Sequence, residues 1–418
     1  MVINFSDNIV DICHNTYNIK STEDIENLTD EELMELYYKV ELQISLDSGM
    51  EQSLKLLGNS MYGGCSHVAF YWFNIDLARD ITGEARNLTH FMEDHLSSHF
   101  KLNWDKMSDV HNMLGVQIDL NKFKHYKENA RPIVYGDTDS LYIEYKSLLD
   151  TVIGVEKMTD GDKLKFLLDL NLKYLNQYNK NLIDNYYLSR HVNSVHDFEL
   201  ETIAKSGIWL DVKKRYAQAL LWKDGRFFDK PKIKVKGLEI IKSSYPKFCR
   251  EGMLAMTKKL LLEDTSAPGF IQKFNFDIGR IKDEFKHQPI DTIASGTSCN
   301  GYAKYVISDS EKYPYPLYEA KAPANVKALA NYNYIINKYK LEDEYIRGGK
   351  IKVYKTKANG DGIFGYIGGE YPQWASKYAP CDYEAMFQIS FLDPINRLMD
   401  AANLPNIHLD GSLELSLF

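Results

Sequence analysis

The sequence shows few of the features that mark disulfide-rich, zinc-binding or membrane-spanning proteins. Its five cysteines are scattered and form no CxxC pair, which argues against a zinc site or a disulfide framework and is typical of a reducing cytoplasm. No apolar run approaches the roughly 18 residues that a membrane span needs, and the first residues do not combine a basic start with an apolar core. We therefore expect no membrane partner.

An overall excess of positive charge is also absent. The chain carries 50 basic and 58 acidic residues, a net charge of −8, so any surface for nucleic acid must be local. At 418 residues the chain is too long for one simple core, and we expect two or three lobes. No internal repeat or low-complexity segment is present.

One segment reverses this charge. The segment from residue 213 to residue 247 contains eleven basic residues and only three acids. This excess of positive charge favours a partner with a phosphate backbone. A solvated lysine-rich face is the alternative interpretation. The basic residues are Lys213, Lys214, Arg215, Lys223, Arg226, Lys230, Lys232, Lys234, Lys236, Lys242 and Lys247, and the acids are Asp224, Asp229 and Glu239.

A pair of carboxylates lies in the stretch IVYGDTDSLYI, residues 133–143. The apolar flanks predict two strands around a turn. In extended backbone, side chains two apart point the same way, so Asp137 and Asp139 could face one point. Mg²⁺ binds one or two carboxylates together with substrate phosphates. Leu141 and Tyr142 exclude an EF-hand, whereas a DxD phosphatase or a plain polar turn stays open from this motif alone.

A second constellation is KLLGNSMYGG, residues 55–64. On a helix beginning near Gly49, Lys55, Asn59 and Tyr62 share one face. The ammonium suits a triphosphate, and the ring beside glycines admits a flat ligand. An amphipathic helix with a glycine cap is the alternative. The apolar positions Leu54, Leu57 and Met61 are expected to face a core.

Elsewhere the pattern gives a coarse map of elements. Acidic residues 30–32 suit a helix start, and Phe276 to Gly279 is interpreted as a loop–helix junction. Helices are expected over residues 21–46, 161–188 and 248–263, and strands over 198–204, 207–212, 215–222, 225–228 and within 348–369.

Taken together, the motifs resemble those of family B DNA polymerases, above all the replicative enzymes of T-even-type bacteriophages. KLLGNSMYG resembles the fingers motif of the family, and YGDTDS resembles its palm motif. The likeness is weak over residues 147–195 and 260–312. Further similar segments are FELET (198–202), KKRYA (213–217), VKGLEIIKSSYPK (235–247), MFQISFLDPINRLMDAANL (386–404) and SLELSLF (412–418).

The resemblance implies a role for each matching residue in template-directed transfer of nucleotides from dNTP to a primer 3′-hydroxyl. Two Mg²⁺ ions would be held by Asp139, with Asp137 as a peripheral acid, and Glu201 would be a supporting acid. The triphosphate would meet Lys55 and Asn59, with Tyr62 and Gly63 beside the nascent base pair. Primer–template DNA would be gripped by Lys213, Lys214, Arg215 and Tyr216.

It also implies an α+β fold in three parts. Residues 1–65 would form the C-terminal part of a helical fingers domain, and residues 66–236 a palm with an antiparallel sheet. Residues 237–418 would form a mostly helical thumb with a small β tip. Its tail, with Leu413, Leu417 and Phe418, would bind a sliding clamp.

Two family features are not found: the first palm motif, DxxSLYP, and an exonuclease domain. The chain is therefore interpreted as the C-terminal subunit of a split polymerase in a bacterial host cytoplasm, inactive until an N-terminal polymerase/exonuclease subunit completes it. Surface that this subunit would cover is expected to expose apolar side chains. The alternative is a non-catalytic module that binds DNA and tethers a clamp.

Overall fold

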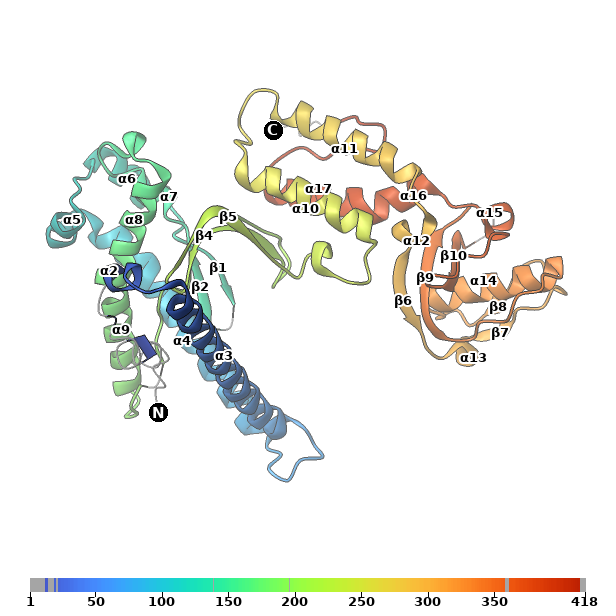
Figure 1. Ribbon diagram of the computed structural model, residues 1–418, viewed down its shortest axis with the longest axis horizontal. Helices are drawn as coiled ribbons and strands as arrows, with labels where there is room; N and C mark the ends of the chain where they lie inside the picture. Colours follow the sequence, from blue (N-terminus) through green and yellow to red (C-terminus); the bar gives the residue numbers. More distant parts are fainter. Residues whose placement is uncertain are drawn as a thin grey trace. The chain divides into compact units, whose positions relative to one another are not determined.

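A computed structural model describes residues 12–13, 19, 22–137, 139–194, 196–357 and 361–413. The chain divides into two compact units, residues 1–91 and 92–418, and Figure 1 shows their elements. The predicted α+β class is confirmed, because the described residues combine many helices with four small antiparallel sheets. The three predicted domain ranges stay predictions.

The first unit is helical. It contains α2 (Thr22–Glu26), α3 (Asp30–Ser66) and the start of α4 (Ile75–Asn103). A capping box fixes the start of α3: the Thr29 hydroxyl accepts the N–H of Glu32, and the Glu32 carboxylate accepts the N–H of Thr29. Such reciprocal bonds satisfy two of the N–H groups left over at a helix start.

The prediction of a separate helix from Gly49 is wrong, since α3 runs through this residue for 37 residues in all. One glycine inside a helix costs only about 1 kcal/mol, too little to end a long hydrogen-bond ladder. The expected core positions Leu54, Leu57 and Met61 are likewise exposed. The core role predicted for these three side chains is therefore wrong.

Helices and a short hairpin open the second unit. The helical prediction for residues 161–188 is confirmed, with a π-helical turn at Asn171–Leu175 between two α-helices. The elements are α5 (Ser108–Leu114), α6 (Leu120–Asn129), β1 (Ile133–Asp137), β2 (Ser140–Ile143), α7 (Lys146–Leu149), α8 (Asp160–Leu170) and α9 (Asn176–Leu188).

A three-stranded sheet of order β3-β4-β5 follows, formed by β3 (Thr202–Trp209), β4 (Tyr216–Lys223) and β5 (Arg226–Lys236). The two short strands expected over residues 198–212 are one continuous strand, β3. Lysines alternate along β5 at positions 230, 232, 234 and 236. Among the described residues this strand pairs only with β4, and lysines along such an edge discourage pairing with other chains.

The C-terminal region combines helices with a small sheet of β6 (Ser295–Cys299), β9 (Gly349–Lys355) and β10 (Ile363–Ile367), in which β9 pairs with both β10 and β6. The strands predicted within residues 348–369 are confirmed. Its longer helices are α10 (Lys247–Leu262), α11 (Phe270–Lys286), α14 (Ala324–Tyr339) and α17 (Asp393–Ala401). Its other elements are α12 (Ile290–Ile293), β6 (Ser295–Cys299), α13 (Tyr302–Tyr305), β7 (Val306–Ser308), β8 (Leu317–Tyr318), β9 (Gly349–Lys355), β10 (Ile363–Ile367), α15 (Ala375–Tyr378) and α16 (Tyr383–Phe387).

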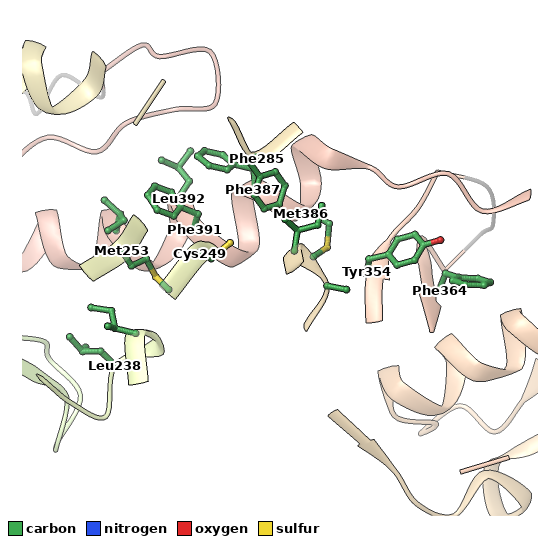
Figure 2. Packing of buried hydrophobic residues seen from close by; sticks show 14 of the residues in the cluster. Leu238, Cys249, Met253, Phe285, Tyr354, Phe364, Met386, Phe387, Phe391 and Leu392 are labelled. Carbon is green, nitrogen blue, oxygen red and sulfur yellow. The ribbon is translucent and has the colours of Figure 1, made fainter. Parts of the chain in front are cut away.

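A continuous hydrophobic core holds this region together (Figure 2). The Phe387 ring lies 5.4 Å from that of Phe285 and 5.0 Å from that of Phe391. Each such ring stabilises the fold by about 1.5–3 kcal/mol through burial. Residues 276–279 lie inside α11, so the predicted loop–helix junction is wrong. The helix continues there because Phe270, Phe274 and Ile278 repeat every four residues and bury one face.

None of the described helices is long and apolar enough to cross a membrane.

Candidate active site

The two candidate carboxylates lie at the tip of the β1–β2 hairpin. Asp137 ends β1 and pairs with Ser140, the first residue of β2. The N–H of Asp139 donates to the carbonyl of Asp137 at 2.5 Å, and the Ser140 hydroxyl donates to the same oxygen at 3.2 Å. Asp139 thus lies in the turn and not in a strand. The expectation that the Asp137 and Asp139 side chains point the same way assumed extended backbone, so it does not apply here. Its side chain is exposed, whereas that of Asp137 is largely covered.

The turn that joins β3 to β4 contacts this hairpin. The N–H of Lys214 donates to the Tyr135 hydroxyl at 2.7 Å, and the Lys214 Nζ lies 3.5 Å from Asp137 Oδ1. Lys214 has a left-handed backbone (φ 64°), which is uncommon for a residue other than glycine. The pair is exposed on the lysine side and contributes only about 0–1 kcal/mol to stability. A cation and a carboxylate therefore share the mouth of this hairpin.

Gly237 is required for this approach. A Cβ atom at this position would lie 2.1 Å from the carbonyl oxygen of Lys214, and the glycine itself has φ +67°. Both facts exclude any larger residue without a shift of backbone. The segment after β5 therefore supports the turn from behind.

Aromatic side chains connect the hairpin to the three-stranded sheet. The hydroxyls of Tyr142 and Tyr216 lie 2.9 Å apart, and the rings of Tyr135, Tyr142 and Trp209 lie within about 6 Å of their neighbours in this group. Burial, together with the hydrogen bond to Tyr216, raises the pKa of Tyr142. Tyr216, a predicted DNA contact, is buried, so in this structure its ring supports the hairpin.

The predicted supporting acid, Glu201, pairs with lysines of the sheet. Its carboxylate lies 3.3 Å from Lys223 Nζ and 3.9 Å from Lys234 Nζ. Asp224, and after it Glu201, raise the pKa of Lys223 against the opposing effect of burial. The structure gives Glu201 cationic neighbours, and its role toward a metal stays a prediction.

Lys213 and Lys214 are exposed in the turn, whereas Arg215 is half-buried and pairs with Glu239. The four residues predicted to grip DNA thus divide into two exposed lysines and two inward-facing side chains. A strongly exposed pair of ammonium groups is suited to phosphate oxygens, which fix register without reading sequence.

The predicted nucleotide-binding residues lie on α3, in the first unit. Lys55, Asn59 and Tyr62 share a helix face and are exposed. A Cβ atom at Gly63 would meet no atom within 4 Å, while one at Gly64 would lie 2.3 Å from the Trp72 indole nitrogen. The open side of Gly63 leaves room for a flat ligand, and Gly64 is needed for internal packing.

The donor set at the hairpin fits a hard cation. Mg²⁺ takes oxygen ligands, keeps several waters and needs only one or two carboxylates beside substrate phosphates, and Asp137 and Asp139 supply that number. In the described part of the chain, no three His, Cys, Asp or Glu side chains gather closely enough to hold a metal by themselves.

The predicted tail is described only at its first apolar residue. Leu413 forms an isolated β-bridge with Ile407 and packs against the hydrophobic core. Leu417 and Phe418 lie outside the described residues.

Four supporting residues were not predicted: Tyr135, Gly237, Glu239, and Arg397, whose Nη2 lies 3.4 Å from Glu239 Oε1. A signal existed for Glu239, which is one of only three acids in the basic segment. The other three act through backbone approach or through contacts between distant segments, and neither leaves a local pattern in the sequence.

Part of the chain is similar in sequence to a known protein family. Residues 33–165 match the family described as DNA polymerase family B. This range begins in α3, contains Lys55, Asn59 and Tyr62, passes through the β1–β2 hairpin and ends in α8.

Individual relatives extend the similarity over most of the chain. The DNA-directed DNA polymerase of Escherichia phage RB69 is 23% identical over 406 residues, which cover 91% of this chain and 40% of that protein. The DNA-directed DNA polymerase of Enterobacteria phage T4 is 21% identical over 407 residues, with the same two shares. The chain therefore spans about 40% of the length of the curated relatives it matches.

Proposed function

We propose that this chain is the C-terminal part of a DNA-directed DNA polymerase, which transfers nucleotides from dNTP to a primer 3′-hydroxyl. The observation that carries the proposal is the contact between the carboxylate hairpin and the exposed lysine turn, with Lys214 Nζ 3.5 Å from Asp137 Oδ1. Nucleotide addition needs anionic ligands for metal ions and cations for the DNA backbone at one place. The family match and the phage relatives agree with this chemistry.

The two carboxylates would hold Mg²⁺, Asp139 as the main ligand and Asp137 beside it. When bound, two such ions neutralise phosphate charge and stabilise the attacking and leaving oxygens. Lys214, now beside Asp137, would turn to a DNA phosphate when a metal neutralises that acid, and Lys213 would contact the next phosphate. The hydroxyls of Tyr135 and Tyr142 connect the hairpin to Lys214 and Tyr216 by hydrogen bonds, which would hold it in place for this role.

Residues of α3 would bind the incoming nucleotide. Lys55 and Asn59 would contact its triphosphate through charge and hydrogen bonds, while Tyr62 and the open side of Gly63 would pack beside the new base pair. Most of the catalysis would come from such positioning, because phosphoryl transfer requires little covalent chemistry from the protein.

A second polypeptide would complete the site. It would supply the remaining palm aspartate, the first fingers helix and the exonuclease. Two observations support this partner: the described hairpin offers a single pair of carboxylates, and the α3 surface exposes Leu54, Leu57, Met61 and other apolar side chains. Contiguous apolar surface of this kind is typical of protein interfaces.

The test is primer extension by the tagged chain captured from its native source together with bound proteins. Asp139→Ala should reduce Mg²⁺-dependent extension by about a thousandfold or more, since metal stabilisation contributes several kcal/mol, and leave primer–template binding in place. Asp184→Ala, an exposed acid of α9, is the matched control and should extend normally. Equal extension by both variants would refute the proposal and favour a non-catalytic DNA-binding module.

The tail would bind a sliding clamp. Removal of residues 413–418 should shorten products on long templates and spare the addition of a single nucleotide. Because Leu413 also packs on the core, Leu417→Ala is the cleaner variant. If the tail serves only the fold, its removal should instead reduce synthesis on long templates and single-nucleotide addition together.

A further inference from the structure

A buried acid lies behind the lysine turn and joins three cations. One Glu239 carboxylate oxygen, Oε1, pairs with the guanidinium of Arg215, with Arg397 Nη2 at 3.4 Å and with Lys242 Nζ at 3.4 Å. The Glu239 side chain is only 8% exposed. A carboxylate so covered needs charged partners to stay ionised.

The charges at this acid are balanced in favour of the ionised form. Burial by itself would raise the pKa of Glu239, but its own backbone N–H and the cations Arg215, Arg397 and Lys242 outweigh burial and lower it. Loss of one partner from such a buried cluster leaves the others without compensation.

The partners come from three separate segments. Arg215 directly follows the exposed Lys213–Lys214 pair, Glu239 lies two residues after Gly237, and Arg397 belongs to α17. The chain passes from the lysine turn to α17 over more than a hundred residues, yet both ends contact one carboxylate. Arg215 is itself 19% exposed, against 59% for Lys214.

We infer that Glu239 is a positioning residue, which draws Arg215 into the protein and ties the lysine turn to the C-terminal helix α17. Arg215 does not contact duplex DNA. Lys213 and Lys214 contact it, and Glu239 fixes their backbone from behind together with Gly237. We call these ion pairs of Glu239 with Arg215, Arg397 and Lys242 the Glu239 cluster. The identity of the ligand rests on the proposed function, whereas the positioning role of the Glu239 cluster rests on the ion pairs alone.

Salt dependence separates contact from positioning. The probe is a fluorescent primer–template duplex, titrated with the full chain at several salt concentrations. Lys214→Gln should reduce the slope of log affinity against log salt by about one, the signature of a lost phosphate contact. Arg215→Gln and Glu239→Gln should keep the slope and weaken binding about two- to thirtyfold. A slope reduced by Arg215→Gln as much as by Lys214→Gln would overturn the inference.

Two further variants guard against simple loss of fold. Glu239→Asp keeps the charge and should bind DNA more tightly than Glu239→Gln. The double variant Arg215→Gln/Glu239→Gln should be no weaker than the weaker single variant, because both remove the same interaction. If the losses of DNA affinity in the two single variants multiply in the double variant, the Glu239 cluster does not act as one unit. Arg280→Gln removes a surface arginine whose partner is Glu284 and should match the unaltered chain.

Hydrogen exchange tests the positioning role of the Glu239 cluster in the absence of DNA. Arg397→Gln, on α17, should speed amide exchange over residues 210–216, while Arg280→Gln should not. Unchanged exchange in Arg397→Gln would overturn the positioning role of the Glu239 cluster even if DNA binds normally. An unaltered chain that fails to bind the duplex would instead count against the proposed function, and the exchange result would still test the Glu239 cluster.

Discussion

Two helices of this chain, α3 and α14, differ in how much of their surface the protein covers. Over its 37 residues α3 buries only Leu36 and Gly64. Over 16 residues α14 buries ten, in an unbroken run from Ala328 to Ile336 together with Val326. A helix covered on nearly all sides belongs to a closed core, whereas exposed apolar side chains on α3 agree with the proposed second polypeptide.

Packing explains the difference. α14 lies against β10 so closely that a Cβ at Gly365 would come within 2.9 Å of the Ala328 methyl group, and buried Asn333 satisfies its amide with Tyr302 and Ile346. The exposed apolar side chains of α3 have no comparable set of described neighbours. The described contacts thus cover α14 on most sides, and they leave most of α3 exposed.

The largest effect should come from the covered helix. Leu329→Ala removes a fully buried side chain and should lower the free energy of unfolding of the second unit by about 2–5 kcal/mol. Denaturant titration followed by fluorescence measures this. A loss below about 1 kcal/mol would mean that the α14 core is not closely packed.

Gly237→Ala should have the next largest effect. The added methyl group would collide with the Lys214 carbonyl, and the backbone at this position is left-handed. We expect a loss of about 1–3 kcal/mol in unfolding free energy. Gly225→Ala is the matched control, because its φ is also positive (+81°) but an added Cβ meets no atom within 4 Å. Equal losses would assign the effect to backbone strain alone.

Acid should weaken the second unit through Glu239. Its folded pKa lies below the ordinary value of 4.5, so its charge stabilises the fold above that pH. This stabilisation is lost as the pH falls through the lowered folded pKa. The acid limb of a thermal-stability profile should therefore be flatter in Glu239→Gln than in the unaltered chain. Parallel limbs would show that Glu239 titrates equally in both states.

The smallest effect should come from the exposed helix. Leu57→Ala should change the stability of the isolated chain by less than about 0.5 kcal/mol, since its side chain is already in solvent. In the complex with the proposed second polypeptide the same change should weaken association by more than about 1 kcal/mol. Titration calorimetry measures the second quantity. A large stability loss in the isolated chain would remove the contrast with α14.

Much of the fold follows from local pattern. The patterns over residues 161–188, 215–222 and 248–263 predicted α8, α9, β4 and α10. The spacing of Phe270, Phe274 and Ile278 also indicates a helix, α11, but a loop–helix junction was predicted there. The continuity of α3 through Gly49 was missed because one glycine was given more weight than a long helical ladder. The exposure of Leu57 was missed because apolar periodicity shows which face wants a partner and not whether the same chain supplies it.

The site was predictable only where a motif carries the chemistry. Asp137, Asp139 and Lys214 were named through the resemblance of their motifs, and the structure brings Lys214 to 3.5 Å from Asp137. Their catalytic roles stay predictions. Arg215 could not be separated from Lys214, since both are cations in one run. Only the fold shows that Glu239, 24 residues further on, draws one of them inward.

The comparison of the two helices predicts that this chain alone does not form a working site. The direct measurement is primer extension with Mg²⁺ by the purified 418-residue chain, set beside an equal amount of the same chain captured with its native partners. We expect extension only from the captured complex, and its loss in Asp139→Ala. Extension by the purified chain at the rate of the complex would contradict the need for a second polypeptide.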